Sequence, residues 1–440
     1  MVGVDQEKTG LGNYFIANYP PFSAWAKSQA AESHAALNRL PVPGTPLGLY
    51  LHIPFCRKRC KFCYFRVYTD KNAKDVGSYL DAIIKEVELL AQTPCVGGRH
   101  LDYVYFGGGT PSYLSADQLR GMMTKLRAIL PWDQAREVAF ECEPGTLQKH
   151  KLETLKDLGV TRLSLGVENF KPSILQFNGR AHLEDEVYRA YGWAREVGFE
   201  QINIDLIAGM VGEDDENWHD CIRKTIAMAP ESVTIYQMEL PYNTTFSKEL
   251  KQIDDAASEP LQIADWPTKR RWVQEAFAEF VAAGYEVSSA YTVVKKKATT
   301  KFVYRDALWT GADMFGTGVA SFGHVNGVHI QNVDTWEAYL EALGRNELPI
   351  GRAYATTVDE RLTREVVLNL KTGSLEAAYF REKFGVDIRT RFAEAFAKLE
   401  RDGWLTPTPA GYELTPAGFL QIDRHLPNFF DAKYRNTRYA

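Results

Sequence analysis

Three of the chain's six cysteines, Cys56, Cys60 and Cys63, lie within eight residues of one another. The residues between them are mostly basic: Arg57, Lys58, Arg59 and Lys61. Thiolates bind iron and zinc, and neighbouring positive charge favours the thiolate over the thiol. This spacing therefore predicts a metal or redox site.

Three interpretations of these cysteines stay open at this point. Positions i, i+4 and i+7 share one face of a helix and would suit a core, but Pro54 and the basic neighbours disfavour a buried helix. A zinc site usually takes four ligands in paired units, and a second pair is missing here. We favour an iron–sulfur cluster on three thiolates, since a cluster usually has four and three leave one iron open.

The residues around the cysteines predict the elements that position them. Short β-prone runs alternate with amphipathic stretches such as Ser78–Gln92, Ala116–Leu130 and Asp185–Gly198. The runs are Leu47–Ile53, Asp102–Phe106, Glu137–Cys142, Arg162–Val167, Ile202–Gly209 and Ser232–Met238. This alternation predicts parallel strands with helical crossovers, and hence an α/β barrel or part of one. Chemistry in such barrels lies at the C-terminal strand ends, where the cysteines follow the first run.

The rest of the chain divides into regions of different character. We expect an arm over residues 1–46, a barrel core over 47–240 and an irregular region that closes the barrel over 241–350. Residues 351–440 follow as a C-terminal domain of three helices and a hairpin, which is typical of a winged helix. Such a shape alone is weak evidence for DNA binding, because fold does not imply function.

The composition of the chain limits the classes of protein to which it can belong. The chain is 45% hydrophobic and 24% charged, as in ordinary globular proteins. Its net charge of -5 disfavours a nucleic-acid or anionic-membrane binder. No stretch approaches the ~18 apolar residues of a membrane span, and the first ten residues lack the apolar run of a secretory signal. We expect a cytoplasmic monomer that acts on a small molecule, without a nucleic acid or a membrane span.

Several further motifs accompany the cysteines along the sequence, and together they resemble a known family. The run YLHIPFCRKRCKFC, Tyr50–Cys63, resembles the opening motif of the radical S-adenosylmethionine (SAM) superfamily, within its oxygen-independent coproporphyrinogen III oxidase group. YFGGGTPSYL, FECEPGT, SLGVENF, NGRAH and NIDLIAGM follow in that group's order, and the resemblance covers residues 46–425. It implies a partial (β/α)6 barrel with a C-terminal winged-helix-like domain. It also implies a [4Fe–4S] cluster on Cys56, Cys60 and Cys63 with SAM at the open iron.

The resemblance further implies partners and contact residues. Members of the group can hold two SAM molecules, and an electron donor such as flavodoxin or ferredoxin would reduce the cluster. By motif matching, Tyr50, Gly108 and Glu141 would contact one SAM. The residues that would contact the other SAM, or lie between the two, are Phe62, Gly109, Thr110, Glu168, Arg180, Asp205 and Met238. Catalytic residues are not identified by the motifs, and Tyr291 and Glu168 are the candidates.

Three functions occur in this group, and two departures bear on them. The decarboxylase typically has a further cysteine two residues after the third, where this chain has Phe65, and a Gln where it has Glu168. The heme chaperone typically begins almost at its first strand, whereas an arm precedes it here, although YQMELPYNTTF resembles the chaperone more closely. We therefore predict methyl or methylene transfer to an sp2 carbon of an aromatic or tetrapyrrole-like molecule, which would use two SAMs. Coproporphyrinogen III oxidation and heme binding without turnover are the alternatives, and the sequence does not identify the substrate.

Overall fold

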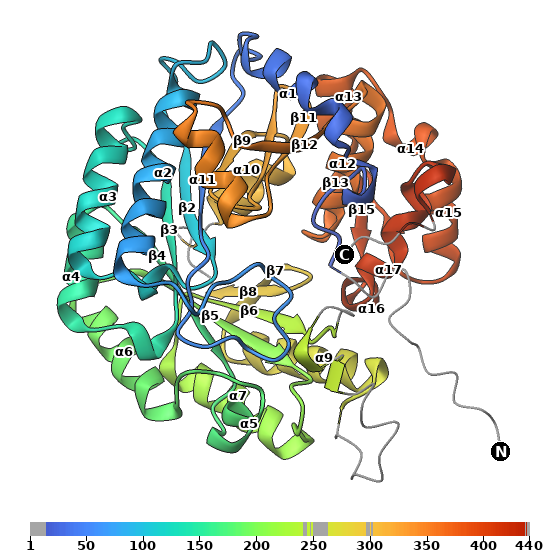
Figure 1. Cartoon of the computed structure of the whole chain (residues 1–440). Helices are drawn as coiled ribbons and strands as arrows, with labels where there is room; N and C mark the ends of the chain where they lie inside the picture. The colour runs from blue at the N-terminus through green and yellow to red at the C-terminus, as the bar shows by residue number, and fades with distance from the viewer. Residues whose placement is uncertain are drawn as a thin grey trace.

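The computed structural model describes residues 15–240, 244–246, 248–249, 263–295, 300, 302–435 and 437. Its centre is a curved sheet in which six consecutive strands run parallel (Figure 1). They are β1 (Leu47–Ile53), β2 (Tyr103–Gly108), β3 (Glu137–Cys142), β4 (Arg162–Glu168), β5 (Gln201–Ala208) and β6 (Ser232–Gln237). The predicted partial α/β barrel with a C-terminal domain is confirmed.

Helices connect these strands and cover the outer face of the sheet (Figure 1). They are α2 (Ala73–Ala91), α3 (Ala116–Ile129), α4 (Lys149–Asp157), α5 (Pro172–Phe177), α6 (Glu184–Glu196) and α7 (Asp215–Met228). Side-chain caps fix where several of them begin. Asn72 and Ser115 each accept backbone N–H groups in a capping box at the start of α2 and α3.

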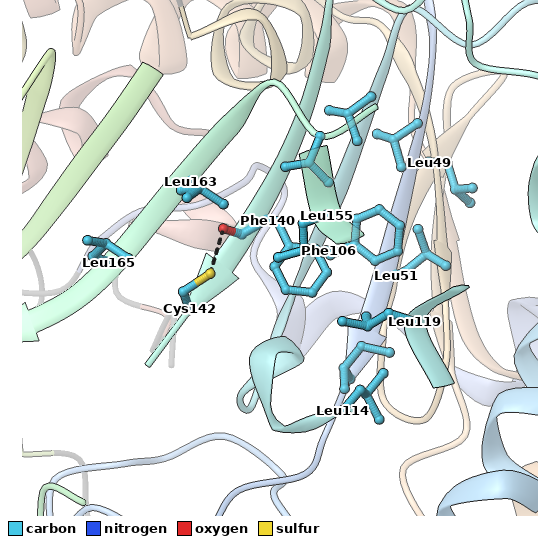
Figure 2. Packing of buried hydrophobic residues seen from close by; sticks show 14 of the residues in the cluster. Leu49, Leu51, Phe106, Leu114, Leu119, Phe140, Cys142, Leu155, Leu163 and Leu165 are labelled. Atoms are coloured by element: carbon cyan, nitrogen blue, oxygen red, sulfur yellow. Dashed lines mark hydrogen bonds between the residues drawn. The ribbon is translucent and has the colours of Figure 1, made fainter. Parts of the chain in front are cut away.

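Alternation along each strand separates the core from the barrel interior. Figure 2 shows Leu49 and Leu51 of β1 packed with Phe106, Phe140 and Leu155 on the helix-facing side. Successive strand residues point to opposite faces, so Tyr50, between the two leucines, points into the barrel. The apolar outer residues hold the barrel together, and the inner residues are left for the site.

The sheet extends beyond the predicted core on both sides. Twelve strands of the described chain follow the order β12-β11-β10-β9-β1-β2-β3-β4-β5-β6-β8-β7. β9 (Asp313–Thr317) runs parallel to β1, and the other added strands are antiparallel. These are β7 (Tyr285–Ser289), β8 (Thr292–Lys295), β10 (Phe322–Val325), β11 (Val328–Asn332) and β12 (Ile350–Ala355).

The prediction of an irregular region over 241–350 is wrong for its described residues. Besides these strands, the region holds α9 (Trp266–Ala282), α10 (Val303–Trp309) and α11 (Trp336–Gly344). Short hairpin strands need no helical crossover, so they break the strand–helix rhythm by which the core was recognised.

Helix α10 covers the N-terminal end of the barrel. Arg162 and Glu137, at the starts of β4 and β3, form a buried ion pair (2.9 Å). Glu137 also accepts the backbone N–H of Tyr304 in α10 (3.1 Å), and the Arg162 guanidinium lies 4.2 Å from the Phe302 ring. The barrel is therefore sealed at this end, and access to its interior is left at the C-terminal strand ends.

The C-terminal domain has its own core and a small antiparallel sheet in the order β13-β15-β14. Its elements are α12 (Val358–Leu370), β13 (Ser374–Glu376), α13 (Ala377–Phe384), α14 (Ile388–Arg391), α15 (Ala393–Arg401), β14 (Leu405–Pro407), β15 (Gly411–Leu414), α16 (Pro416–Leu420) and α17 (Ile422–His425). The third predicted helix is divided at Phe392, which lies between α14 and α15 with φ -116 and ψ 28.

The described part of the N-terminal region is packed against the rest of the molecule. Tyr19 is fully buried and stacks on Phe430 of the C-terminal domain (4.8 Å). Ala26 pairs with Ala353 of β12, and α1 (Ala30–Leu37) lies against β11 and β12. The predicted arm is thus part of both cores over these residues, while residues 1–14 lie outside the described ones.

Short 3-10 turns complete the secondary structure: η1 (Phe22–Ala24), η2 (Lys27–Gln29), η3 (Pro111–Tyr113), η4 (Pro144–Thr146), η5 (Leu426–Phe429) and η6 (Ala432–Tyr434). Among the helices of the described residues, none combines the length and the apolar character needed to cross a bilayer.

Candidate active site

The cysteine segment forms a loop that is tied down near both ends. The Cys56 N–H donates to the Tyr68 carbonyl (3.1 Å), and the Tyr68 N–H donates to the Pro54 carbonyl (2.7 Å). Cys56, Cys60 and Cys63 are partly exposed along this loop. Because the loop follows β1, it lies at the C-terminal end of the barrel, the end that α10 leaves open.

Two polar groups from other loops donate to cysteine sulfurs. Thr110 Oγ1 lies 3.3 Å from Cys56 Sγ, and Arg180 Nη1 lies 3.4 Å from Cys60 Sγ. Burial nevertheless raises the pKa of the Cys56 thiol to about 12 and raises that of Cys63 as well. The nearby guanidiniums act in the expected direction, since Arg59 and Arg180 lower the pKa of Cys63 and Arg180 lowers that of Cys56, but burial outweighs them.

The basic residues of the loop have other partners. Arg57 pairs with Glu143 (3.0 Å), and Arg59 donates to the carbonyl of Cys63 (3.1 Å). Lys61 forms an ion pair with a glutamate (3.1 Å). These contacts fix the path of the loop, so the one guanidinium that donates directly to a described cluster thiol is that of Arg180, from a distant motif.

The glycine-rich segment after β2 lies directly against the cysteine loop. The Gly109 N–H donates to the Ile53 carbonyl (2.8 Å), and the Thr110 N–H donates to the Phe55 carbonyl (2.8 Å). A Cβ on Gly109 would lie 2.8 Å from the carbonyl carbon of Pro54, which is too close for any side chain. Gly109 therefore has a structural role in holding the two loops together, besides the predicted approach to SAM.

Two carboxylates point into the barrel from β3 and β5. Glu141 accepts hydrogen bonds from the Tyr105 hydroxyl (2.7 Å) and the Gly108 N–H (3.2 Å). Asp205 accepts from Ser164 Oγ (2.7 Å) and Asn203 Nδ2 (2.9 Å). Burial raises the pKa of Glu141 to about 7 and that of Asp205 to about 6, so both are sensitive to a positively charged ligand near neutral pH.

Glu168 is held in an unusual backbone conformation. Its φ is +66°, and the β4–β5 register shifts between Gly166 and Glu168. Such a bulge re-aims a side chain at a strand end, and here the Glu168 carboxylate lies 3.7 Å from Arg180. Burial raises the pKa of Glu168 to about 7, although the Arg180 charge opposes that shift. Arg180 thus connects a cluster cysteine to an interior carboxylate.

The sequence motifs did not single out His52, which lies two residues after Tyr50 on β1. The Tyr50 hydroxyl lies 3.2 Å from His52 Nδ1. His52 Nε2 is buried, and burial lowers the pKa of the ring to about 4, although a hydrogen bond with the Arg66 backbone opposes that shift. The i, i+2 spacing from Tyr50 was the available signal, because it places both side chains on the inner face.

The remaining predicted residues fall in two places. Phe62 packs against a small apolar cluster that contains buried Met238, so the structure brings these two together. Tyr291 lies apart from them: its hydroxyl donates to Asp423 of α17, and its ring lies 4.9 Å from Phe15. The site assignments of all these residues stay predictions, and the structure gives Tyr291 a partner in the C-terminal domain.

The donor set suits a cluster better than a single ion. Among the described residues, no three His, Cys, Asp or Glu side chains converge on one metal position. A cubane spreads its thiolates over separate irons, so cysteines at three points of one loop suit it. The donors at Cys56 and Cys60 and the glycine segment without side chains fit a cluster with a polar ligand beside it.

Comparison with known families identifies two regions of the chain. The model for the radical SAM superfamily matches residues 50–225, which contain the end of β1, the cysteine loop and the strands β2–β5. The model for the HemN C-terminal domain matches residues 356–420.

Similar proteins extend over nearly the whole chain. An oxygen-independent coproporphyrinogen III oxidase of Synechocystis is 26% identical, over 97% of this chain and 93% of its own. The heme chaperone HemW of Bacillus subtilis is 28% identical, over 84% of this chain and 96% of its own. The solved structure of coproporphyrinogen III oxidase (HemN) from Escherichia coli has a TM-score of 0.81 and 24% identity, covering 94% and 96% of the two chains. The last likeness establishes a shared fold.

Proposed function

The chain belongs to the radical SAM superfamily and carries the HemN C-terminal domain, and from this premise we propose that it oxidises a porphyrinogen without oxygen. It is a radical SAM enzyme, and its cofactors are a [4Fe–4S] cluster and SAM. The predicted superfamily and cofactors are confirmed. We assign the cluster to Cys56, Cys60 and Cys63.

The observation that carries the reaction is the length of the alignment with the Synechocystis oxidase. It spans 97% of this chain, so it includes the N-terminal region as well as the C-terminal domain. The chaperone relative spans 84% of the chain. The presence of an N-terminal arm therefore disfavours a chaperone function and is compatible with the oxidase function.

The chain's own residues would bind and orient the cofactors. A cluster held by Cys56, Cys60 and Cys63 would supply, when reduced, the electron for the reductive cleavage of SAM on which hydrogen abstraction depends. Glu141 is placed to accept the SAM ammonium, because burial leaves it without a counter-charge of its own. Arg180 holds Cys60 and Glu168 in fixed relation. The seal at α10 limits access by water to one end of the barrel.

The proposed reaction converts a propionate side chain into a vinyl group. The side chain loses one hydrogen atom, one electron and CO2, so a one-electron acceptor is needed besides SAM. An electron donor for the cluster and a second SAM at the residue set around Glu168 and Asp205 belong to the same proposal.

Methyl or methylene transfer, the reaction that the motifs predict, is a second candidate. Its support is the residue two positions after Cys63, which is Phe65 where the decarboxylase typically has a cysteine, together with Glu168 at the position of a typical Gln. Transfer would consume a second SAM as the one-carbon donor, whereas decarboxylation would not need one for that purpose.

One experiment separates these reactions. The protein is reconstituted with iron and sulfide without oxygen, then given SAM, a reductant and coproporphyrinogen III. 5′-Deoxyadenosine with CO2 and a vinyl product supports oxidation. S-Adenosylhomocysteine beside deoxyadenosine supports one-carbon transfer instead, and tight heme binding with little turnover supports a chaperone. The variant with Cys56, Cys60 and Cys63 all replaced by Ala is the control, and SAM cleavage by it would refute the cluster assignment.

A further inference from the structure

The connection between α5 and α6, residues 178–182, forms a bracket along the cysteine loop. The Lys61 N–H donates to the Asn178 carbonyl (3.0 Å) at one end of the bracket. Towards the other end, Arg57 Nη2 donates to the Ala181 carbonyl, also at 3.0 Å. The two segments therefore meet at two points that enclose the middle cysteine of the loop.

The middle of the bracket lies close against the loop. Gly179 has φ +78°, and a Cβ there would lie 3.2 Å from the Lys61 nitrogen and 3.3 Å from the Arg59 carbonyl oxygen. Glycine permits both this backbone conformation and the close approach of the two chains. The next residue of the bracket, Arg180, is thereby brought to the loop, where its Nη1 lies 3.4 Å from Cys60 Sγ.

The bracket is fixed at both ends to other parts of the barrel. The Asn178 side chain is fully buried, donates to the Val211 carbonyl (2.9 Å) and accepts the Val211 N–H (3.1 Å). At the other end, the His182 ring is 1% exposed. Its Nε2 lies 3.2 Å from the Val167 carbonyl, and its Nδ1 lies 3.1 Å from Glu143 Oε1. Buried polar side chains that are satisfied in this way specify one arrangement of the segments they join.

Glu143 joins the His182 end of the bracket to the cysteine loop. Its carboxylate accepts hydrogen bonds from Arg57 Nη2 (3.0 Å) and from the Gly145 N–H (3.1 Å). Burial opposes the ionisation of Glu143, but His182 and Arg57 together hold its pKa below the usual value. A Cβ on Gly145 would overlap Arg57 Nη2, so glycine leaves the space that the guanidinium occupies. The side chain that follows Cys56 is therefore held in a niche that His182 completes.

We propose that the bracket holds Cys56 and Cys60 in the positions that a cluster needs, with Asn178 and His182 as its positioning residues. A loop that is ordered before the metal arrives loses less conformational entropy on binding it. Groups that orient metal ligands without touching the metal also contribute strongly to metal affinity. This inference rests on the proposed assignment of the cluster to the three cysteines of the loop, since it names the residues that order them.

The first experiment measures the alkylation of thiols in the folded, metal-free chain. The three cysteines of the loop are partly exposed and the other three are buried, so the fast-reacting thiols are those of the loop. His182→Ala should raise their alkylation rate about fivefold, the change that one lost hydrogen bond produces. The matched control is His329→Ala on β11. His329 is equally buried and also lies 3.0 Å from a backbone carbonyl, but the control should react as the parent does.

The second experiment measures how fast a chelator removes iron from the reconstituted protein in the absence of substrate. His182→Ala and Gly145→Ala should each lose iron about tenfold faster than the parent, and the electron paramagnetic resonance signal of the reduced cluster should change in both. Gly145→Ala keeps the His182 ring and displaces Arg57, and its control is Gly192→Ala on α6, where a Cβ has open space. Adding Arg57→Ala to His182→Ala should accelerate the loss little further, because both changes break the same contact.

Each result bears on the bracket or on the reaction. Faster alkylation and faster iron loss in His182→Ala, with His329→Ala like the parent, support the bracket. Parental rates of iron loss in both His182→Ala and Gly145→Ala overturn it and leave the cluster assignment standing. Should His182→Ala fail to fold, the rate of iron loss in Gly145→Ala decides by itself. A parent that takes up no iron overturns the cluster assignment and the bracket with it, whereas a parent that holds iron but gives no vinyl product overturns the oxidation alone.

Discussion

Replacement of Asp423 by alanine should destabilise the junction that holds the N-terminal region on the C-terminal domain. Lys371 is fully buried at this junction, 2.9 Å from Asp423. Its ammonium also donates to the Ile16 carbonyl (2.5 Å) and lies 4.0 Å from the centre of the Phe15 ring. Asp423 in turn accepts the Ile16 N–H (2.9 Å). The pair therefore joins three segments that are far apart in the sequence.

The size of the effect follows from burial. Without Asp423, the Lys371 ammonium stays buried and keeps only the weaker attraction of Glu239, and the Ile16 N–H loses its acceptor. Breaking a buried pair in this way costs about 3–5 kcal/mol. Replacing both residues, as in Lys371→Met with Asp423→Ala, removes the uncompensated charge and should cost much less than the two single changes added together.

The loss should also depend on pH. Burial lowers the pKa of Lys371 below its usual value, and the loss of Asp423 lowers it further. The unfolded chain then binds more protons than the folded chain at pH values between the folded pKa and about 10.4, so stability rises with pH in that range. The cost of Asp423→Ala should therefore be smaller at pH 9 than at pH 7.

Urea unfolding followed by tryptophan fluorescence measures this cost, because Trp309 lies 6.0 Å from the Lys371 ammonium. The control is Asp359→Ala, which removes a half-exposed partner of Arg391 and should cost less than about 1 kcal/mol. An Asp423→Ala variant as stable as this control, or a double variant whose loss equals the sum of the single losses, would refute the reasoning.

Three further predictions concern the site. If Glu141, with its pKa of about 7, binds the SAM ammonium as a carboxylate, SAM affinity measured by calorimetry should fall about tenfold from pH 8 to pH 6, and Glu141→Gln should remove that dependence. Gly109→Ala should displace the loops, since its Cβ would lie 2.8 Å from Pro54; the reconstituted iron content should fall, whereas Gly121→Ala, with open space at its Cβ, should leave it unchanged. Arg180→Lys cannot reach Cys60, Gly166 and Glu168 together, so the electron paramagnetic resonance signal of the reduced cluster should change, and an unaltered spectrum would contradict the role of Arg180.

The strands of the core were predictable because burial, and the alternation of side chains between the two faces, give the sequence a recognisable pattern of apolar residues. Leu47–Ile53 and Glu137–Cys142 were predicted with the bounds that β1 and β3 have. Each is buried on the helix-facing side and carries a predicted site residue on the other, and each is followed by a motif of polar residues and glycine. The hairpin strands β7 and β8 have neither a following motif nor a crossover helix. Their pairing depends on contacts with other segments of the fold, which the local sequence does not indicate.

The residues of the candidate site were named from motifs, but their arrangement was not predictable. Motif order indicated Glu141, Glu168, Arg180 and Asp205; Glu141 and Asp205 lie within β3 and β5, Glu168 is the last residue of β4, and Arg180 lies between α5 and α6. The motif order could not indicate which basic side chain donates a hydrogen bond to a cysteine sulfur. The four nearby in sequence looked suited to that role, but the group that does so is Arg180, which is 120 residues away from Cys60 along the chain.

The backbone of Glu168 shows why such an arrangement escapes sequence reasoning and what it implies. A non-glycine residue at φ +66° costs energy that only the surrounding structure can compensate. In regular β geometry, Glu168 would share the inward face of Gly166 two residues earlier. It keeps that face, since its Oε1 lies 3.0 Å from where a Cβ on Gly166 would be, and there it meets Arg180, whose other nitrogen donates to Cys60. Glu168→Gly should relieve the strain and stabilise the metal-free chain slightly, yet weaken SAM binding through the loss of the carboxylate. A variant that gains stability and keeps full SAM affinity would mean that the bulge serves the fold alone.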